Sequence, residues 1–317
     1  MITRLHILVS CSNRKSLEIR PDLQFRNITG ESIKGRLKEW TKRIDASTDK
    51  RVAAKHVYQG DHWQVSLSLI EAAAKIGIDA ELWIGSAGYG LLHWRDAILG
   101  YSATFSARHE DSVVEGQGPN AELATKWWEG LARWAPNGVD GPRSVHELVM
   151  MDPKAAFMAV GSPTYFSAWR GDLERALDAI GDPQQFLLVS AGTQSIGKLE
   201  SHLLPADARF QSHVNGAMVS LNARIAQLVL QQIREAGGIS LDEIHKRLER
   251  LLEQLPDPQK YDRRRRSDAE LIELIKNRLR NDHDIKRSPL LRLLRDEGYA
   301  CEQRRFKQLY TQALEKL

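Results

Sequence analysis

Polar loops of similar composition follow four apolar segments of the chain. They cover residues 10–15, 85–90, 161–165 and 190–193 and are rich in serine, glycine and threonine. A single loop of this kind is usually no more than a turn between a strand and a helix. In an open parallel sheet, however, ligands bind beyond the carboxyl ends of the strands, so four such loops together favour a ligand site.

Asp61 stands before a long amphipathic segment, in the sequence Tyr-Gln-Gly-Asp-His of residues 58–62. Its simplest role is to stabilise the positive end of the helix that begins there. The alternative role is catalytic, because a carboxylate can orient water or stabilise the oxocarbenium-like transition state of a glycosyl transfer. Small residues around Arg224 favour close packing of a later helix on the sheet, while Arg224 itself is a candidate contact for a phosphate.

The sequence gives little support for a metal or cofactor site. The histidines are scattered, and neither a His-Glu-x-x-His nor a Cys-x-x-Cys spacing occurs. The chain has no Walker-type phosphate loop, and the glycines of residues 85–90 have the wrong spacing for a dinucleotide fingerprint. We therefore expect neither a metal nor a cofactor. Cys11 is a candidate nucleophile, although a buried structural thiol is the commoner fate of such a residue.

All eight tryptophans lie between residues 40 and 169. Each by itself is best interpreted as core packing. Four of them flank expected loops or helix faces where they would be able to stack on a base or a sugar: Trp94, Trp127, Trp128 and Trp169. As a group they favour a roomy pocket for a flat or glycosylated ligand.

An α/β fold is expected to position these residues. Four apolar runs have the length and composition of buried parallel strands, at residues 5–10, 81–85, 155–161 and 185–190. Amphipathic segments predict helices at about 33–44, 62–76, 121–134, 144–151, 168–180 and 220–236. The alternation is typical of a three-layer α/β/α domain with a four-stranded, mainly parallel sheet.

The sequence after Gly237-Gly238 predicts helices only. Helix starts are expected at Ser240, Ser267 and Ser288, and a last helix from Glu302 to about residue 314. A helix, a short glycine-containing turn and a second helix together form the helix-turn-helix pattern. We therefore expect an α/β domain of residues 1–238 and a helical domain of residues 239–317.

The net charge of +4 is unevenly distributed. Residues 241–317 hold 19 Lys and Arg against 15 Asp and Glu, so the whole excess lies in the last quarter of the 317-residue chain. A basic helical domain favours DNA binding, although a solvated basic helix is the alternative. The candidate DNA contacts are Arg263, Arg264, Arg265, Arg266, Gln303, Arg304, Arg305 and Lys307.

Composition excludes two classes of protein. The hydrophobic fraction of 42% and the short apolar runs fit neither a disordered chain nor a membrane-spanning one. The N-terminus lacks the features of a signal peptide, and two cysteines provide neither a disulfide framework nor a zinc quartet. We expect a cytoplasmic protein without a membrane partner or an obligate protein partner.

Four strings of the sequence resemble a family of bacterial proteins of the DUF6884 type. They are LVSCSNRK at residues 8–15, HVYQG at 56–60, LWIGSAGYGLL at 82–92 and ILGYSAT at 98–104. That family is similar to the uracil-DNA-glycosylase-like domain, which is also found in archaeosine-pathway tRNA enzymes. The resemblance extends to an antiphage DNA glycosylase that removes glucosylated hydroxymethylcytosine. It covers residues 5–105 well and 155–225 loosely, and it does not include the basic tail.

The resemblance implies a DNA glycosylase that turns a modified base, such as a glucosylated one, out of the stack and leaves an abasic site in viral DNA. The basic tail, Arg14 and Lys15 would hold the phosphates. Base and sugar would lie among Cys11, Ser12, Tyr58, Ser86, Tyr89, Ser162 and Tyr165.

The chain departs from the usual uracil-glycosylase motifs. Both Gly-x-Asp-Pro-Tyr and His-Pro-Ser-Pro are absent, and residues 11–15 and 190–193 take their places. Asn13 or Asp61 is then expected to activate the water. No lysine is placed as a Schiff-base nucleophile, so a monofunctional hydrolase without lyase activity is predicted.

Two other functions remain open at this point. One is a transglycosylase that exchanges a base in tRNA or DNA, as in deazaguanine modification. The other is a DNA-binding sensor of a nucleotide, without enzymatic activity.

Overall fold

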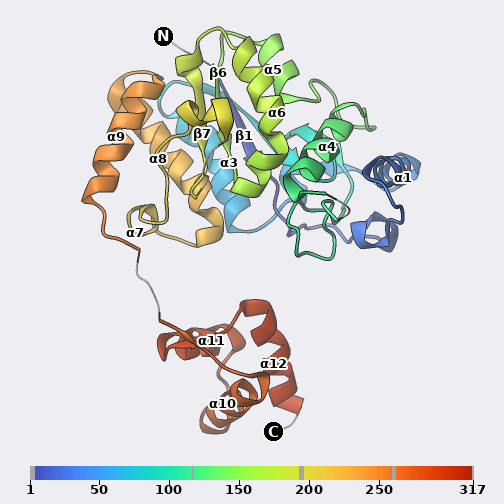
Figure 1. The fold of residues 1–317 in the computed structure, drawn as a ribbon, viewed down its shortest axis with the longest axis vertical. Helices are drawn as coiled ribbons and strands as arrows, with labels where there is room; N and C mark the ends of the chain where they lie inside the picture. Colours follow the sequence, from blue (N-terminus) through green and yellow to red (C-terminus); the bar gives the residue numbers. More distant parts are fainter. Residues whose placement is uncertain (1–3, 116–117, 193–195, 259–261, 316–317) are drawn as a thin grey trace. The chain divides into compact units, whose positions relative to one another are not determined.

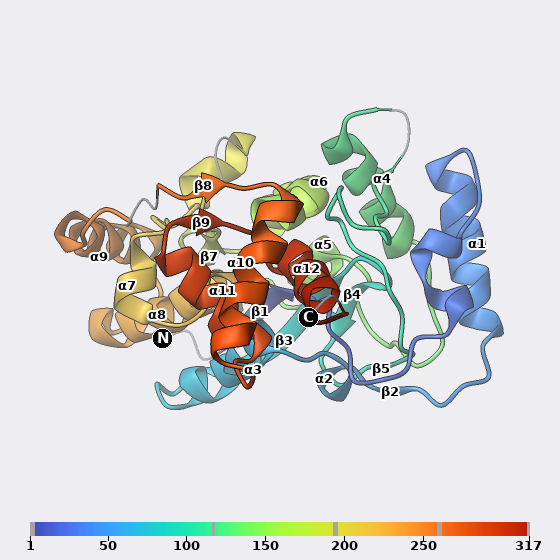
Figure 2. The ribbon, with the colours of Figure 1, turned by 90° about the horizontal axis from the view of Figure 1, so that it is seen from below.

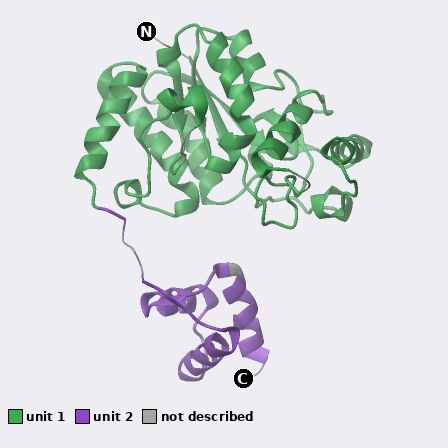
Figure 3. Ribbon diagram, in the orientation of Figure 1, with its two compact units in different colours: residues 1–256 green, residues 257–317 purple. Residues whose placement is uncertain are grey.

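The chain forms two compact units in a computed structural model, Met1–Pro256 and Asp257–Leu317 (Figure 3). The structure describes residues 4–115, 118–192, 196–258 and 262–315. Each unit has its own cluster of buried apolar side chains. The two units are described separately below.

A five-stranded sheet forms the centre of unit 1 (Figure 1). The strand order is β4-β3-β1-β6-β7, and all neighbouring strands are parallel except β3 and β4. The strands are β1 Arg4–Ser10, β3 Asp79–Ser86, β4 Gly90–His93, β6 Ala156–Val160 and β7 Phe186–Val189. The α/β class, the four parallel strands and the mainly parallel sheet are confirmed.

The predicted number of four strands is wrong, because β4 adds an antiparallel edge strand. The glycine-rich residues 85–90 were expected to be a ligand loop, but they form a tight turn that reverses the chain, with Ser86 opposite Gly90. The Ser86 hydroxyl accepts hydrogen bonds from the backbone N–H groups of Gly88 and Tyr89 within this turn. A four-residue strand next to such a turn has too few side chains to show a period.

Helices lie on both sides of the sheet (Figure 1). On one side α3 (Asp61–Ala74) packs against α8 (Leu221–Ala236), and on the other α6 (Pro163–Ala179) packs against its two neighbours. These neighbours are α4 (Asn120–Ala132) and α5 (Val145–Met151), and α1 (Ile33–Ala46) packs against α4. All six predicted helices of the body are present. The start of α6 is five residues earlier than predicted, because Pro163 takes a first-turn position, where its missing N–H costs nothing.

Several short elements connect the larger ones in unit 1. A two-stranded antiparallel ribbon joins β2 (Val52–Ala53) to β5 (Ala97–Ile98). The short helices are α2 (Ala54–Val57), α7 (Phe210–Val214), η1 (Pro21–Leu23), η2 (Phe25–Asn27), η3 (Pro183–Gln185), η4 (Gly197–His202) and η5 (Met218–Ser220).

The boundary between the units lies after Pro256 and not at Gly237-Gly238. The helix α9 (Leu241–Gln254) belongs to unit 1, because its apolar side chains are buried in the same cluster as the sheet. These side chains, at helical spacing, are Leu241, Ile244, Leu248 and Leu252. The predicted boundary is thus corrected. The sequence becomes all-helical after residue 238, but unit 1 continues through α9 to Pro256.

Unit 2 is a small helical unit with a core of its own. It contains α10 (Asp268–Asn281), α11 (Arg287–Asp296), α12 (Gln303–Glu315) and a two-residue parallel pairing of β8 (Arg264–Arg265) with β9 (Tyr299–Ala300). Helices α10 and α12 lie side by side (Figures 1 and 2). With the corrected boundary, unit 2 holds 16 Lys and Arg against 11 Asp and Glu, whereas unit 1 holds 29 against 30. The basic excess therefore belongs to unit 2 alone.

No helix among the described residues is both long enough and apolar enough to span a membrane.

Candidate functional site

A pocket of about 350 Å³ opens where β1 and β6 end. The loop after β1 contributes residues 10–14 to its wall, and Ser162 and Tyr165 after β6 contribute another part. The remaining lining residues come from the start of α3, from the segment after β5 and from the start of α8: Gln59, Gly60, Asp61, His62, Thr104, Ser106, Val219 and Asn222. The first and third predicted loops therefore meet at the carboxyl ends of parallel strands, as expected for a ligand site.

The second and fourth loops have other roles. The glycines of the second loop allow close packing: a Cβ on Gly85 would lie 2.2 Å from the Trp169 ring, and one on Gly88 would lie 2.4 Å from the Tyr101 ring. Ala191 of the fourth loop contacts the pocket wall through Asn222, whose Oδ1 accepts a hydrogen bond of 2.8 Å from the backbone N–H of Ala191. Thr193 of this loop lies outside the described residues.

Asp61 lies in the pocket wall at the first position of α3, after Gly60, whose φ of 101° suits glycine. The Ser220 hydroxyl donates to its Oδ2 at 2.5 Å, and the Arg224 guanidinium donates to its Oδ1 at 3.0 Å. These two hydrogen bonds lower the pKa of the Asp61 carboxyl below its ordinary value. The carboxylate is 45% exposed and is therefore a fixed negative charge that a ligand can reach.

Arg224 is engaged by this carboxylate. Its Nε also donates to the Ser220 hydroxyl at 3.1 Å, and 23% of its side chain is exposed. Arg224 therefore positions the Asp61–Ser220 pair through Nε and Nη2, and this engagement takes the place of the predicted phosphate contact.

Cys11 and Tyr165 meet at the inner part of the pocket. The Cys11 thiol and the Tyr165 hydroxyl form a buried hydrogen bond of 3.1 Å. Burial raises the pKa of the Tyr165 hydroxyl well above its ordinary value. Tyr165 is therefore neutral at physiological pH, and either its hydroxyl or the Cys11 thiol can donate the hydrogen bond. Cys11, Ser12, Ser162 and Tyr165 thus lie where the sequence predicted them, in the wall of one pocket.

Tyr58, Ser86 and Tyr89 do not line the pocket, so the expectation that base and sugar lie among these three residues is wrong. The Tyr101 hydroxyl is hydrogen-bonded to the Tyr58 hydroxyl at 2.8 Å and to the Ser86 hydroxyl at 2.7 Å, behind the pocket. The Tyr89 hydroxyl accepts from the backbone N–H of Leu99, and the Tyr89 side chain is fully buried. These three residues stabilise the core and leave no ring face for a ligand.

The tryptophans do not form the roomy pocket that their number suggested. None of the eight is among the residues described as lining the pocket, and Trp127, Trp128 and Trp169 are at most 1% exposed. The indole N–H of Trp127 donates to the carbonyl of Ala87, and that of Trp128 donates to Asp172. Trp94 is half-buried between the cationic groups of Lys55 and Arg95. Core packing, the simpler interpretation, is therefore correct.

Arg14 and Lys15 point in different directions. The exposed Arg14 side chain lines the pocket and makes no ion pair with any described residue. The Lys15 ammonium lies 4.2 Å from the centre of the Tyr101 ring and donates to the carbonyls of Ser12 and Asn13. Arg14 is available to a phosphate, but the predicted phosphate contact at Lys15 is wrong, because the side chain is turned inward.

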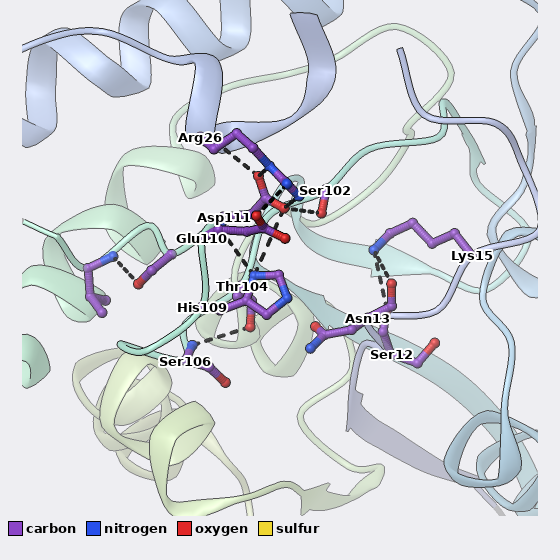
Figure 4. A network of polar contacts seen from close by, with 12 residues as sticks. Ser12, Asn13, Lys15, Arg26, Ser102, Thr104, Ser106, His109, Glu110 and Asp111 are labelled. Carbon is purple, nitrogen blue, oxygen red and sulfur yellow. Dashed lines mark hydrogen bonds and ion pairs between the residues drawn. The ribbon is translucent and has the colours of Figure 1, made fainter. Parts of the chain in front are cut away.

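Asn13 is exposed at the mouth of the pocket. Its side chain points away from Lys15 and towards the segment that carries Thr104 and Ser106 (Figure 4). That segment is fixed by Asp111, a fully buried carboxylate that accepts hydrogen bonds from Arg26 and from the Ser102 hydroxyl. The wall opposite Asn13 is therefore rigid.

His62, next to Asp61 in the first turn of α3, also lines the pocket. Its Nε2 lies 3.0 Å from the carbonyl oxygen of Ser10, so this nitrogen donates. Burial lowers the pKa of the imidazole, which keeps the ring neutral at physiological pH. Its Nδ1 is a buried acceptor without a partner among the described residues.

The rim of the pocket carries an apolar tip. Met218 and Val219 are 51% and 74% exposed, and Val219 lines the pocket. They follow Asn215 and Gly216, whose φ values of 54° and 91° are both positive. A Cβ on Gly216 would lie 2.4 Å from Nε of Arg224, so this segment is packed directly on the guanidinium that holds Asp61.

In unit 2, some candidate DNA contacts already bind another group of the protein, and others are exposed and available to a ligand. Arg266 pairs with Glu270, Arg305 pairs with Asp268, and Nε of Arg263 donates to a backbone carbonyl. The exposed side chains that make no ion pair with a described residue are Arg264, Arg265, Gln303 and Lys307. The side chain of Arg304 lies outside the described residues.

Sequence reasoning missed several lining residues, among them Gln59, Thr104, Ser106, Val219 and Asn222. Thr104 stands in the string ILGYSAT of residues 98–104, but the sequence alone does not show that it lies near the loop after β1. Among the residues that the structure describes, no three His, Cys, Asp or Glu side chains are grouped so as to hold a metal ion.

Comparisons with known proteins assign no family to the chain. No family model, no curated protein and no solved structure matches it.

Proposed function

We propose that the protein is a monofunctional DNA glycosylase that hydrolyses the N-glycosidic bond of a modified base and leaves an abasic site. The observation that carries the proposal is the ionised Asp61 carboxylate, which Ser220 and Arg224 fix in the wall of a pocket lined by hydroxyl and amide groups. A fixed negative charge stabilises an oxocarbenium-like sugar in the transition state.

Asp61 and Asn13 divide the chemistry. With its lowered pKa, Asp61 is a weak base, so its main contribution is electrostatic stabilisation of the sugar cation. The Asn13 amide orients the attacking water. The water oxygen bonds to C1′ as the bond from C1′ to the base nitrogen breaks, and the electron pair leaves with the base. The proton that the water loses passes through solvent to the departing base nitrogen, so the products are a sugar hydroxyl and a neutral free base.

The pocket and its rim suit a nucleotide turned out of a duplex. A volume of about 350 Å³ lies near the lower end of the ~300–1,000 Å³ usual for small-molecule sites. The exposed pair Met218 and Val219 would insert between bases at the gap that the turned-out nucleotide leaves. Arg14 at the mouth would hold a neighbouring phosphate.

Unit 2 supplies the second contact with DNA in this proposal. Its net positive charge and the available side chains Arg264, Arg265 and Lys307 favour phosphate binding. We include in the proposal a uracil-DNA-glycosylase-like arrangement of unit 1 and a helix-turn-helix in α10–α12. The resemblance noted in the sequence extends the proposal to a glucosylated base in viral DNA and to a cytoplasmic role in antiviral defence.

Mass spectrometry of bases released from a panel of phage DNAs with different modifications tests the proposal. The wild-type protein should release one modified base and leave alkali-labile sites. Asp61→Asn and Asn13→Ala should each lower the rate by about 10²- to 10³-fold while DNA affinity stays unchanged. Asp207→Asn is the matched control, because Asp207 also forms a pair with an arginine, Arg209, and does not line the pocket.

The other two functions give different results in the same experiment. A transglycosylase releases base only when a free base is added to the reaction. A sensor releases none and leaves no alkali-labile site. Full activity in both Asp61→Asn and Asn13→Ala would contradict the assignment of the site even if a base is released.

A further inference from the structure

Lys15 follows the pocket loop but turns its charged end away from solvent. Its Nζ lies 4.2 Å from the centre of the Tyr101 ring and 5.7 Å from that of Tyr58. It donates hydrogen bonds of 3.3 and 3.4 Å to the carbonyl oxygens of Ser12 and Asn13. Figure 4 shows this side chain reaching over the backbone of the pocket loop.

The surface beneath Lys15 is rigid. Hydrogen bonds to Tyr58 and Ser86 fix the Tyr101 hydroxyl, so the ring under the ammonium has one position. Backbone pairing of Lys15 with Tyr58 fixes the start of the side chain as well. The backbone of Lys15 is held by its pairing with Tyr58, and its ammonium is held over the Tyr101 ring. The ammonium therefore has a fixed position from which it donates hydrogen bonds to the carbonyls of the loop.

This arrangement costs folding free energy. Desolvation lowers the pKa of the Lys15 ammonium below 10.5, and attraction by Cys11 and Asp111 offsets only part of the effect. Lys15 forms no ion pair with a carboxylate among the described residues. An apolar side chain would pack over Tyr58 and Tyr101 without this cost. Perturbed charges of this kind cluster at functional sites.

We propose that Lys15 is a positioning residue, whose ammonium holds the carbonyls of Ser12 and Asn13 and thereby fixes the Asn13 side chain in the pocket wall. For its catalytic consequence the proposal rests on the proposed glycosylase function. For its structural consequence it does not, because the ordering of residues 11–15 is measurable without a substrate.

Because the Lys15 ammonium holds the loop by hydrogen bonds, the order of the loop should depend on the protonation state of Lys15 and therefore on pH. The groups that face the ammonium are Cys11 at the end of β1, Tyr58 after α2, and Tyr101 and Asp111 after β5. Burial raises the pKa of Tyr58 and Tyr101 well above the ordinary value, so both stay neutral while Lys15 loses its proton. As pH rises through the pKa of Lys15, the hydrogen bonds to the loop weaken and the rate should fall.

Three full-length variants test the proposal. Lys15→Met removes the charge and keeps the length of the side chain. Lys15→Arg keeps a charge at every accessible pH and can still donate to the carbonyls. Lys55→Met is the matched control, because Lys55 also lies over an aromatic ring, that of Trp94, but outside the pocket.

Two readouts are needed, hydrogen exchange of the peptide that contains residues 11–16 and the single-turnover rate of base release between pH 7 and pH 11. Lys15→Met should exchange faster in this peptide, release base about a hundredfold more slowly, and show no alkaline decline. Lys15→Arg should recover part of the rate and retain it to higher pH than the wild type. Lys55→Met should match the wild type in both readouts.

The outcomes separate this proposal from the proposed function. Unchanged hydrogen exchange in Lys15→Met overturns the positioning role, whether or not the protein releases a base. Faster exchange in a protein that releases no base from any DNA supports the positioning role and contradicts the glycosylase. A wild-type rate in Lys15→Met with normal melting also overturns the proposal.

Discussion

Asp61 is the central residue of the proposed glycosylase site. Protonation of its carboxylate should set the lowest pH at which the protein releases a base, which is called the acid limit below. Its hydrogen bond from Ser220 is the largest cause of the lowered pKa. The carboxylate is therefore ionised above the folded-state pKa and becomes neutral as pH falls through that value, which lies below 3.8. Activity should persist into mildly acidic solution.

Ser220→Ala should move this limit upward. Without the hydroxyl the pKa of Asp61 returns towards 3.8, so the loss of base release begins at a higher pH than in the wild type. The measurement is the single-turnover rate from pH 3 to pH 7, restricted to the range in which circular dichroism shows a folded protein. An acid limit that does not move would mean that Asp61 is not the group that titrates.

The sequence identified part of the site but not its boundaries. Cys11, Asn13 and Asp61 were predicted because each is a reactive or polar residue at the end of a strand or the start of a helix, and all three line the pocket. Tyr58 and Tyr89 stand in similar places in the sequence but are buried. Their orientation depends on hydrogen bonds with residues about ten to forty positions away, which a local pattern does not contain.

Among the loops, residues 215–220 have a proposed role that a substitution can test clearly. If Met218 and Val219 insert into the base stack, replacing both with alanine should slow base release from duplex DNA by about tenfold or more, because the turned-out nucleotide returns to the stack more easily. Release from single-stranded DNA should not change, since no stack has to be opened.

A matched pair of exposed methionines provides the control. Met150 and Met151 at the end of α5 are 59% and 70% exposed and do not line the pocket. Their replacement by alanine should leave both rates unchanged. An equal loss on duplex and single-stranded DNA in the Met218 and Val219 variant would indicate a damaged pocket and not a missing wedge.

The main elements of unit 1 were predictable, because long periodic segments carry enough side chains to show a face. The helices α3 and α8 and the strand β1 are examples. The strand β4 was not predictable, since it is four residues long and follows a glycine-rich turn. The position of α9 was not predictable either: an amphipathic helix shows that one face is covered, but not which unit covers it.

The division of the chain at Pro256 predicts how truncated proteins behave. A protein that ends at residue 256 keeps α9 and should melt as cooperatively as unit 1 does in the full chain. A protein that ends at residue 238 exposes the apolar surface that α9 covers. Burial of the four side chains Leu241, Ile244, Leu248 and Leu252 stabilises the fold by about 1.5–3 kcal/mol each as an upper bound.

The shorter protein should therefore lose about 5 kcal/mol, which is below this upper bound, and melt about 10 °C lower. Differential scanning calorimetry of both truncated proteins measures this. Equal melting temperatures would contradict the assignment of α9 to unit 1. The protein of residues 1–256 should also bind DNA more weakly and with a smaller dependence on salt, because the basic unit is missing.

The measurement that tests the proposed glycosylase function most directly is the stoichiometry of base release. Full-length protein is mixed in excess with phage DNA that carries glucosylated hydroxymethylcytosine, and free base and alkali-labile sites are counted in the same sample. The account predicts one free base for each abasic site, no strand break before alkali, and loss of both products in Asp61→Asn. Binding of the DNA without release of any base, or equal release by the wild type and Asp61→Asn, would contradict it.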